Sequence, residues 1–207
     1  MTTMLNFVYT NKNSLSVGLC QEIIKRFEEE KHKYPGGTAI GIDKNIKDTT
    51  DFLINSSNVI WAEIDTCLRN EVYKNLEQYL KLLNKEYENV NAKLGTSYEF
   101  KFMNRKKLSF ETLQIQRYDI GGGRYAYHTD EGFTKERYRV LTYLFYLNNV
   151  EEGGETDICN SKFLIKPEAG KLIIFPASWC FPHAGHIPKS GSKYIVTGWI
   201  YADKYYI

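Results

Sequence analysis

The stretch that decides the fold is LQIQRYDIGGGRYAYHTD, residues 113–130. Its first part lies in a short run rich in β-branched and aromatic residues, which predicts a β-strand. The glycine run that follows has no helical pattern after it and lets the chain turn into a second strand. That strand leads to His128 and Asp130. At the end of a strand, a spacing of two residues points both side chains to the same face, where one metal ion could bind both.

A third candidate ligand, His183, lies far along the chain. Apolar runs flank it at residues 171–176 and 194–200, so we expect it on a separate strand. Two imidazoles and one carboxylate are the ligands of a facial-triad iron site, which leaves three coordination positions open. The competing interpretation is a surface loop plus a hydrogen-bonded core histidine.

Lys193 follows His183 by ten residues. The sequence PKSGS, residues 188–192, is rich in turn formers and predicts a hairpin that would lay Lys193 beside the metal strand. A buried lysine opposite an open metal site is costly unless it meets an anion. A dicarboxylate bound to the metal by its oxo-acid end would present its other carboxylate to this lysine.

Four segments occur in an order that resembles one enzyme family. They are the opening stretch, RVLTYLFYLNNVEEGGET at 139–156, KPEAGKLIIFP at 166–176 and HAGHIPKSGSKYIVTGWI at 183–200. Together they resemble the 2-oxoglutarate and Fe(II)-dependent dioxygenases, specifically the prolyl 4-hydroxylase-like branch, over residues 112–201. The resemblance implies a double-stranded β-helix, also called a jelly roll, of the cupin-like kind.

The resemblance assigns the iron ligands to His128, Asp130 and His183. His186 lies only three residues beyond His183, so either histidine could be the distal ligand. The spacing of ten residues to the lysine in this branch selects His183. An odd offset along a strand also places His186 on the opposite face, which predicts a supporting or substrate-side position for it.

The resemblance also implies a co-substrate site. Lys193 matches the basic residue that pairs with the distal carboxylate of 2-oxoglutarate. Tyr118 and Tyr146 match positions where the family places hydroxyl groups around that molecule. Thr197 and Trp199 share the strand alternation of Lys193, so we expect them to line the same pocket.

The implied reaction is hydroxylation of a C–H bond, with succinate and CO2 formed from 2-oxoglutarate. The cofactors and co-substrates would be Fe(II), 2-oxoglutarate and O2, and the branch points to ascorbate as well. The expected substrate is a peptidyl proline in a peptide or protein. Alternatives are the same chemistry on another amino-acid residue, a small molecule or a nucleic-acid base, a non-catalytic metal-binding module, and a cupin-like zinc protein.

Composition is compatible with such an enzyme. The chain has 207 residues, and its 27 basic and 25 acidic residues give a net charge of +2, which carries no signal for nucleic acid or an anionic membrane. The first fifteen residues lack the basic and apolar blocks of a secretory signal, and no apolar run approaches about 18 residues. We therefore expect a cytoplasmic protein; the sequence carries no signal for an oligomeric state.

The four cysteines, at 20, 67, 159 and 180, are widely spaced and include no CxxC pair. This pattern argues against a zinc or disulfide framework. Cys180, in an apolar run three residues before His183, is interpreted as a small core residue rather than a reactive thiol.

The first half of the chain predicts two helices. Residues 16–33 carry an apolar stripe at steps of three and four, and residues 57–87 carry a longer one from Ile60 through Leu83. Ser57 is the expected N-cap of the second helix. His32 is expected at a solvated helix end. The polar segment at 36–55 predicts either substrate contact or an edge strand.

The fold class follows from these patterns. From about residue 99 onward, short runs rich in β-branched and aromatic residues alternate with turn formers. We predict a mainly β chain with N-terminal helices (α+β), in which a jelly roll is buttressed by two long helices. Residues 1–207 would form one domain, with a helical support region at 1–98 and the catalytic core at 99–207.

Overall fold

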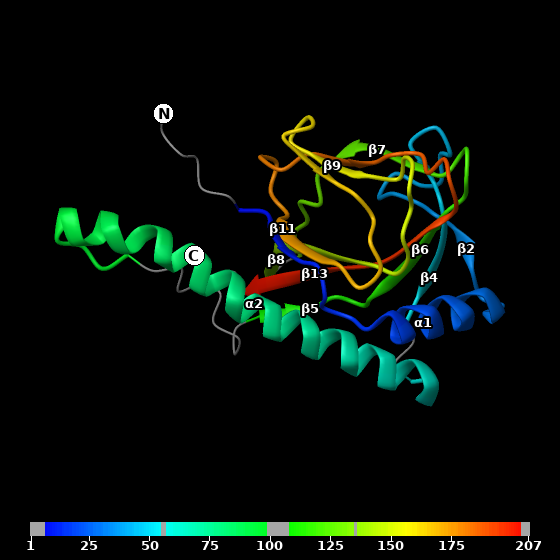
Figure 1. Cartoon of the computed structure of the whole chain (residues 1–207), viewed down its shortest axis with the longest axis horizontal. Helices are drawn as coiled ribbons and strands as arrows, with labels where there is room; N and C mark the ends of the chain where they lie inside the picture. The colour runs from blue at the N-terminus through cyan, green and yellow to red at the C-terminus, as the bar shows by residue number, and fades with distance from the viewer. Residues whose placement is uncertain (1–6, 55–56, 99–107, 135, 204–207) are drawn as a thin grey trace.

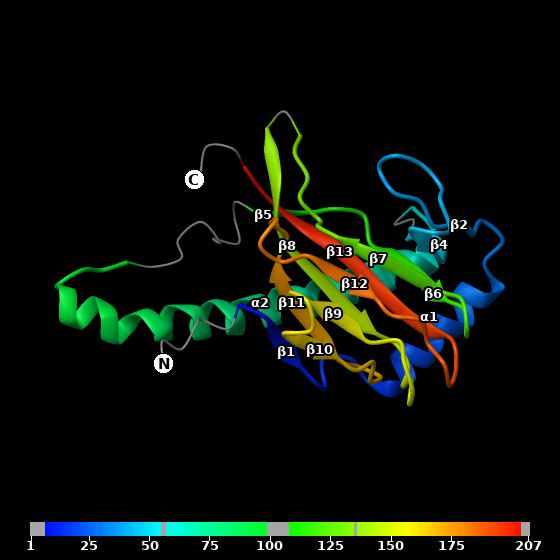
Figure 2. The same ribbon diagram turned by 90° about the horizontal axis from the view of Figure 1, so that it is seen from above.

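The computed structural model describes residues 7–54, 57–98, 108–134 and 136–203. Two antiparallel β-sheets face each other, and two helices cover the outer face of the larger sheet (Figure 1). Figure 2 shows the strands of the smaller sheet lying over those of the larger one and running in roughly the same direction. This arrangement confirms the predicted jelly roll with helical buttresses. The domain boundary predicted at residue 99 lies outside the described residues.

The larger sheet has eight strands. Seven of them follow the order β1 (Tyr9–Asn11), β11 (Leu172–Pro176), β8 (Arg137–Tyr146), β13 (Lys193–Asp203), β6 (Gln114–Tyr118), β4 (Thr50–Leu53) and β2 (Tyr34–Pro35), and β5 (Leu108–Phe110) pairs with β13. The long strands β8 and β13 run side by side at its centre. The sheet therefore combines strands from both ends of the sequence.

The smaller sheet has five strands. Their order is β10 (Phe163–Ile165), β9 (Thr156–Ile158), β12 (His183–Gly185), β7 (Arg124–His128) and β3 (Lys47–Asp48). The predicted strand that leads to His128 is β7, and His183 begins β12. Both expected metal strands therefore belong to one sheet and pair directly.

The predicted hairpin at residues 188–192 is wrong. Strand β12 pairs on both sides within the smaller sheet, with β7 and β9. Strand β13 pairs with β6 and β8 in the larger sheet. Because both edges of each strand are taken, the turn-rich segment crosses from one sheet to the other, and Lys193 approaches the metal strands from the opposite layer.

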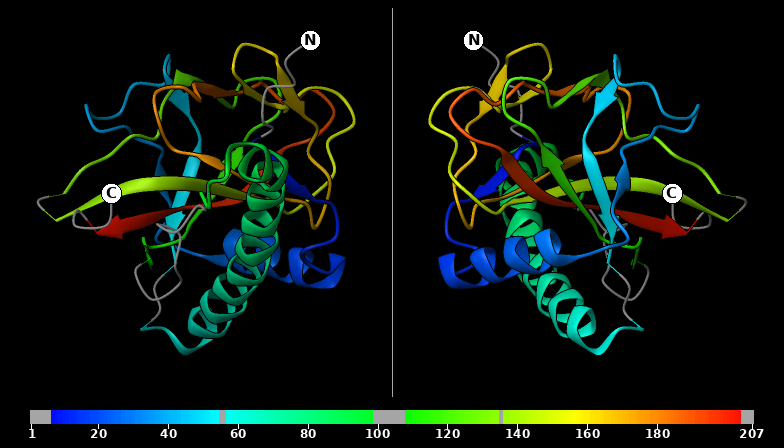
Figure 3. Two further views of the ribbon diagram at one scale, coloured as in Figure 1. Left: turned by 90° about the vertical axis from the view of Figure 1, so that its left-hand side faces the viewer. Right: turned by 90° about the vertical axis from the view of Figure 1, so that its right-hand side faces the viewer.

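Two helices form the buttress. Helix α1 (Val17–Glu29) begins at Ser16, whose side chain accepts a hydrogen bond from the backbone N–H of Leu19. Helix α2 (Val59–Leu94) is capped by Asn58, not by the predicted Ser57, because the Asn58 carboxamide oxygen accepts from the N–H of Ile60. End-on views show α2 running beneath the larger sheet (Figure 3).

Helix α2 differs from the prediction in its first buried residue and in the position of its end. Trp61 rather than Ile60 is buried at the start, and Ile60 is exposed. The helix continues past the predicted end at residue 87, because no breaker occurs before Gly95, which adopts a left-handed conformation with φ 65°. His32 is exposed beyond the end of α1, as expected for a solvated position.

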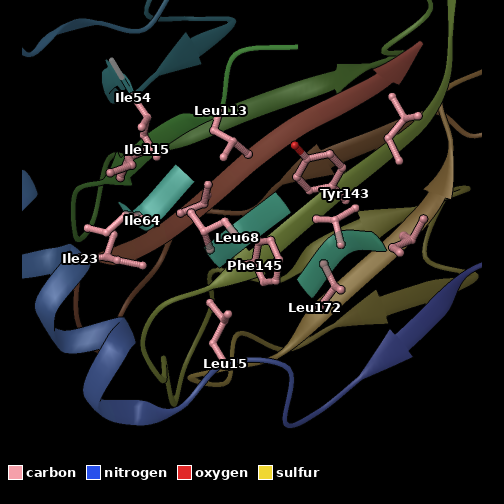
Figure 4. Packing of buried hydrophobic residues seen from close by; sticks show 14 of the residues in the cluster. Leu15, Ile23, Ile54, Ile64, Leu68, Leu113, Ile115, Tyr143, Phe145 and Leu172 are labelled. Carbon is pink, nitrogen blue, oxygen red and sulfur yellow. The ribbon is translucent and has the colours of Figure 1, made fainter. Parts of the chain in front are cut away.

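Alternation along β8 divides the apolar interior into two layers. Tyr143 and Phe145 pack with the helices, against α2 residues such as Leu68 (Figure 4). Leu144 and Tyr146 point the other way, into a cluster between the two sheets. The helices therefore stabilise one face of the larger sheet and leave its other face to line a pocket.

The segment at 36–55 joins both sheets, so the N-terminal half is not purely helical. β3 is an edge strand of the smaller sheet, and β4 lies between β6 and β2. Buried Lys47 donates to buried Asp51 at 2.6 Å, and the Thr49 hydroxyl donates to the same carboxylate at 2.7 Å. This network ties the two strands together.

We expect Asp51→Ala to destabilise the fold by about 3–5 kcal/mol, because it leaves the Lys47 charge buried without its partner. Replacing both residues, Lys47→Met with Asp51→Leu, should cost less, since no uncompensated charge remains. Urea denaturation of the three proteins measures this difference. An Asp51→Ala protein as stable as the parent would show that the pair contributes little.

Candidate active site

The predicted ligands meet in one cluster. Ligand atoms of His128, Asp130 and His183 all lie within 4.8 Å of one another. The Nε2 atom of His183 is 3.3 Å from Asp130 Oδ2, and the Nε2 atom of His128 is 3.6 Å from Asp130 Oδ1. This is the only group of three or more such side chains found among the described residues.

The backbone orients both imidazole rings. Nδ1 of His128 lies 2.8 Å from the carbonyl oxygen of Ala126, and Nδ1 of His183 lies 3.2 Å from that of Phe181. Each carbonyl can only accept, so the Nδ1 atom donates in each contact and Nε2 is left as the nitrogen that faces Asp130 and can ligate a metal. Both Nε2 atoms are therefore available to ligate a metal.

A β-bulge shapes the ligand layer. His128 pairs with His183. Tyr125, which lies three residues before His128, pairs with Gly185, which lies only two residues after His183. The extra residue in β7 changes the alternation, so Tyr125 and His128 lie on one face. Their rings stack with centroids 3.5 Å apart, while Phe175 meets His183 edge-on at 4.9 Å. These contacts restrict both imidazoles.

Asp130 is held from the opposite sheet. The Thr142 hydroxyl in β8 donates to Asp130 Oδ2 at 2.7 Å. Burial alone would raise the pKa of Asp130, but the charges and hydrogen bonds of His183 and His128 hold it well below its usual range. The carboxylate is therefore ionised, which a metal ligand requires.

Thr142 gives a testable prediction. Thr142→Val keeps the shape of the side chain but removes the hydroxyl that fixes the Asp130 carboxylate. We expect the dissociation constant for Co(II), a probe metal, to rise on the order of tenfold, as for other groups that orient metal ligands. Titration followed by cobalt absorption measures it. Unchanged affinity would mean that Asp130 is positioned without Thr142.

Lys193 is buried, with 1% of its surface exposed. Its Nζ atom donates to the Gly154 carbonyl at 3.0 Å and lies 3.9 Å from the centre of the Tyr118 ring. Within the described part of the chain no carboxylate pairs with it at salt-bridge distance. Burial lowers the pKa of Lys193 to about 7, although the charge of Glu155 opposes this shift.

The two predicted tyrosines are both buried beside this region. The Tyr118 hydroxyl donates to Gln116 at 3.1 Å, and the Tyr146 hydroxyl donates to Thr156 at 2.7 Å. Burial raises the pKa of each hydroxyl above its ordinary value. Both therefore stay protonated and can act as hydrogen-bond donors.

One pocket between the sheets brings the three metal-ligand candidates and Tyr118 together, whereas Lys193 and Tyr146 are not among the residues that line it. It is lined by the three metal-ligand candidates together with Gln116, Tyr118, Tyr125, Thr142, Leu144, Thr156, Ile195, Thr197 and Trp199, among others. Thr197 and Trp199 thus line it as predicted. The sequence analysis did not identify Thr142 or Thr156. Thr142 could have been found from its even spacing to Tyr146 along the strand.

His186 does not join the cluster. Its Nε2 atom lies 3.3 Å from Asp157 and its Nδ1 atom 3.8 Å from Glu155, and its side chain is 41% exposed. It does not line the pocket, because β12 pairs regularly with β9 over residues 183–185, so an odd offset from His183 leads to the other face. The odd-offset argument is therefore confirmed for His186.

Residues 113–201 match the model of the 2OG-Fe(II) oxygenase superfamily. A PKHD-type hydroxylase from Synechococcus sp. strain CC9902 is 30% identical over 93 residues, 43% of this chain and 40% of the relative. A putative prolyl 4-hydroxylase of Acanthamoeba polyphaga mimivirus is 25% identical over 97% of this chain and 76% of the relative. The alignment to the cyanobacterial hydroxylase thus spans less than half of its length.

The fold has solved counterparts. A prolyl hydroxylase from Trichoplax adhaerens, solved with a peptide fragment of the hypoxia inducible factor oxygen degradation domain, superposes with a TM-score of 0.69. The identity is 19%, and the match covers 96% of this chain and 84% of the other. The likeness shows a shared fold. No helix among the described residues is long and apolar enough to cross a membrane.

The residues present fit Fe(II) and 2-oxoglutarate. Two imidazole nitrogens and an ionised carboxylate converge on one point, which suits a facial-triad iron. Buried Lys193 packs on Tyr118, which lines this pocket, and no described carboxylate lies at salt-bridge distance from it, so a dicarboxylate could supply the anionic partner. Residues 113–201 thus match the 2OG-Fe(II) oxygenase superfamily, and His128, Asp130 and His183 form an HxD and distal-histidine triad that fits an iron site of that kind.

Proposed function

We propose, from the match of residues 113–201 to the 2OG-Fe(II) oxygenase superfamily, that this protein hydroxylates a C–H bond of a peptidyl proline. The observation that carries the proposal is the pocket lined by His128, Asp130 and His183, with buried Lys193 packed on Tyr118 in its wall. Prolyl hydroxylase names recur among the similar proteins, which supports proline over other targets.

Each residue has a role in the proposed reaction. His128, Asp130 and His183 would hold the iron, and Lys193 would bind the distal carboxylate of 2-oxoglutarate. Tyr118 and Tyr146 would donate hydrogen bonds to that molecule and exclude water around it. When bound, iron and 2-oxoglutarate supply the oxidative chemistry, with succinate and CO2 as co-products.

A cleft of about 490 Å³ adjoins the pocket and offers a place for the substrate. It shares Asp130, Tyr125 and Trp199 with the pocket lining. The indole Nε1 of Trp199 is buried without a hydrogen-bond partner in the structure. A peptide carbonyl in the cleft could accept from it, which supports a peptide rather than a small apolar substrate.

The test incubates the protein with Fe(II), 2-oxoglutarate, ascorbate and proline-containing peptides. Matched peptides carry alanine in place of proline. We expect a mass gain of one oxygen atom on the proline peptides alone, together with succinate that depends on iron and 2-oxoglutarate. Succinate without peptide oxidation would indicate another substrate. Metal binding without any succinate would indicate a recognition module or a zinc protein.

A further inference from the structure

We propose that Cys159 and Cys180 form a reversible redox-modification site. Hydrogen peroxide would convert the two thiols into a disulfide, and its closure would weaken metal binding at the triad. The formation of the disulfide is inferred from the two cysteines alone. The effect on metal binding rests on the proposed function, because it requires His183 to be a metal ligand.

The two cysteines lie side by side although 21 residues separate them in sequence. The Cys159 thiol donates to the backbone carbonyl oxygen of Cys180 at 3.4 Å. The backbone N–H of Cys159 also donates to the Pro182 carbonyl at 2.8 Å, so the chains run together at this point. The Cys159 sulfur therefore needs only local side-chain movement to reach that of Cys180.

The local backbone turns Cys159 away from the regular ladder. Cys159, Asn160 and Ser161 all have positive φ angles, of 57°, 54° and 63°. Asp157 fixes this turn by accepting hydrogen bonds from the Ser161 backbone N–H at 2.6 Å and hydroxyl at 2.9 Å. The turn is thus held where the thiol faces the segment that leads into β12.

Both thiols are accessible to a small oxidant. Cys180 is exposed and Cys159 is half-buried, whereas Cys20 is buried. Peroxide oxidises accessible thiols first. The exposed sulfur of Cys180 is therefore the expected first target, and Cys159 is the neighbour that resolves the product. Cys67 is exposed too, but it lies on α2 and serves as a control.

The reaction balances with peroxide as the oxidant. The Cys180 thiolate attacks one peroxide oxygen, the O–O bond breaks, and water leaves after proton uptake, which gives a sulfenic acid. The Cys159 thiolate then attacks the Cys180 sulfur, the S–O bond breaks, and a second water leaves. Two electrons pass from the sulfurs to the peroxide, and an added dithiol reverses the change.

The pair is connected to the metal site through one peptide unit. Phe181 directly follows Cys180, and its carbonyl accepts the hydrogen bond from Nδ1 of His183. His183 also pairs with Ile158, the residue before Cys159. Disulfide closure must break the contact between the Cys159 thiol and the Cys180 carbonyl. The adjacent Phe181 carbonyl would shift with it, and the orientation of the His183 ring would be lost.

The first experiment detects the disulfide without using the metal. Reduced, metal-free full-length protein is treated with peroxide, alkylated and digested with trypsin without reduction. The cysteines then lie in separate fragments, residues 140–162 and 172–189, which a disulfide would link. We expect the linked pair in the parent and in Cys67→Ser, and its loss in Cys159→Ser and Cys180→Ser. Absence of the linked pair in the parent overturns the proposal.

The second experiment tests the effect on the metal site. After peroxide is removed, Co(II) is titrated into reduced and oxidised protein. We expect the oxidised parent to bind on the order of tenfold more weakly, with recovery after dithiothreitol and no peroxide effect in Cys180→Ser. Equal affinities of the two forms would overturn the coupling. Weak binding already in the reduced parent would instead contradict the triad as a metal site.

Discussion

We expect alanine at His128, Asp130 or His183 to abolish 2-oxoglutarate turnover. Each change removes one of only three protein ligands, and the remaining two hold a divalent metal weakly. Asp130→Ala should have the largest effect, because its carboxylate contacts both imidazoles and carries the negative charge of the site. Succinate formation with saturating Fe(II) and 2-oxoglutarate measures the loss.

The control for this prediction is His186→Ala. His186 lies three residues from His183 but faces Asp157 and Glu155 outside the pocket. We expect this variant to bind iron and turn over 2-oxoglutarate like the parent. Thermal unfolding of all four variants separates loss of ligands from loss of fold. A protein that needs His186 and tolerates alanine at His183 would contradict the ligand assignment.

The sequence was sufficient to identify the three metal-ligand candidates because their determinants are local. The two-residue spacing of His128 and Asp130 and the flanking apolar runs of His183 are properties of single strands. The same reasoning correctly separated His186 from His183. It could not anticipate the stacking of Tyr125 on His128. That contact depends on a β-bulge, which one extra residue in the pairing creates without a sequence signal.

Contacts between distant segments were less predictable. The burial of Lys193 was anticipated correctly, but through a hairpin that does not exist. Turn formers at residues 188–192 signal a change of direction, not which strand the chain pairs with afterwards. The proximity of Cys159 and Cys180 likewise follows from the pairing of β9 with β12. Their wide spacing had argued against a disulfide framework. The prediction that Cys180 is a small core residue is wrong, because the structure leaves Cys180 exposed.

Lys193→Ala should raise the concentration of 2-oxoglutarate needed for half-saturation by about a hundredfold to a few thousandfold. Removing one partner of a buried charge pair costs about 3–5 kcal/mol, and each 1.4 kcal/mol is about a factor of ten in affinity. Affinity for Co(II) without 2-oxoglutarate should change little, because Lys193 is not a metal ligand.

Two further variants separate charge from volume. Lys193→Met fills a similar space without the charge, so it should lose as much affinity as alanine does. Lys193→Arg keeps the charge, but its planar guanidinium must fit where Nζ now contacts Gly154 and the Tyr118 ring. We expect partial rescue. Equal affinities of all four proteins for 2-oxoglutarate would show that Lys193 does not bind it.

The pH dependence of binding tests the same residue in the unmodified protein. Burial lowers the pKa of Lys193 to about 7 in the ligand-free structure. Below that pH the lysine is protonated and ready to pair with a carboxylate. Above it, binding must first take up a proton, so affinity for the 2-oxoglutarate dianion should fall by up to about tenfold per pH unit. In Lys193→Met this decline should be absent.

A parent profile as flat as that of Lys193→Met between pH 7 and pH 9 would contradict the assignment. It would mean that no proton bound at Lys193 contributes to holding the co-substrate.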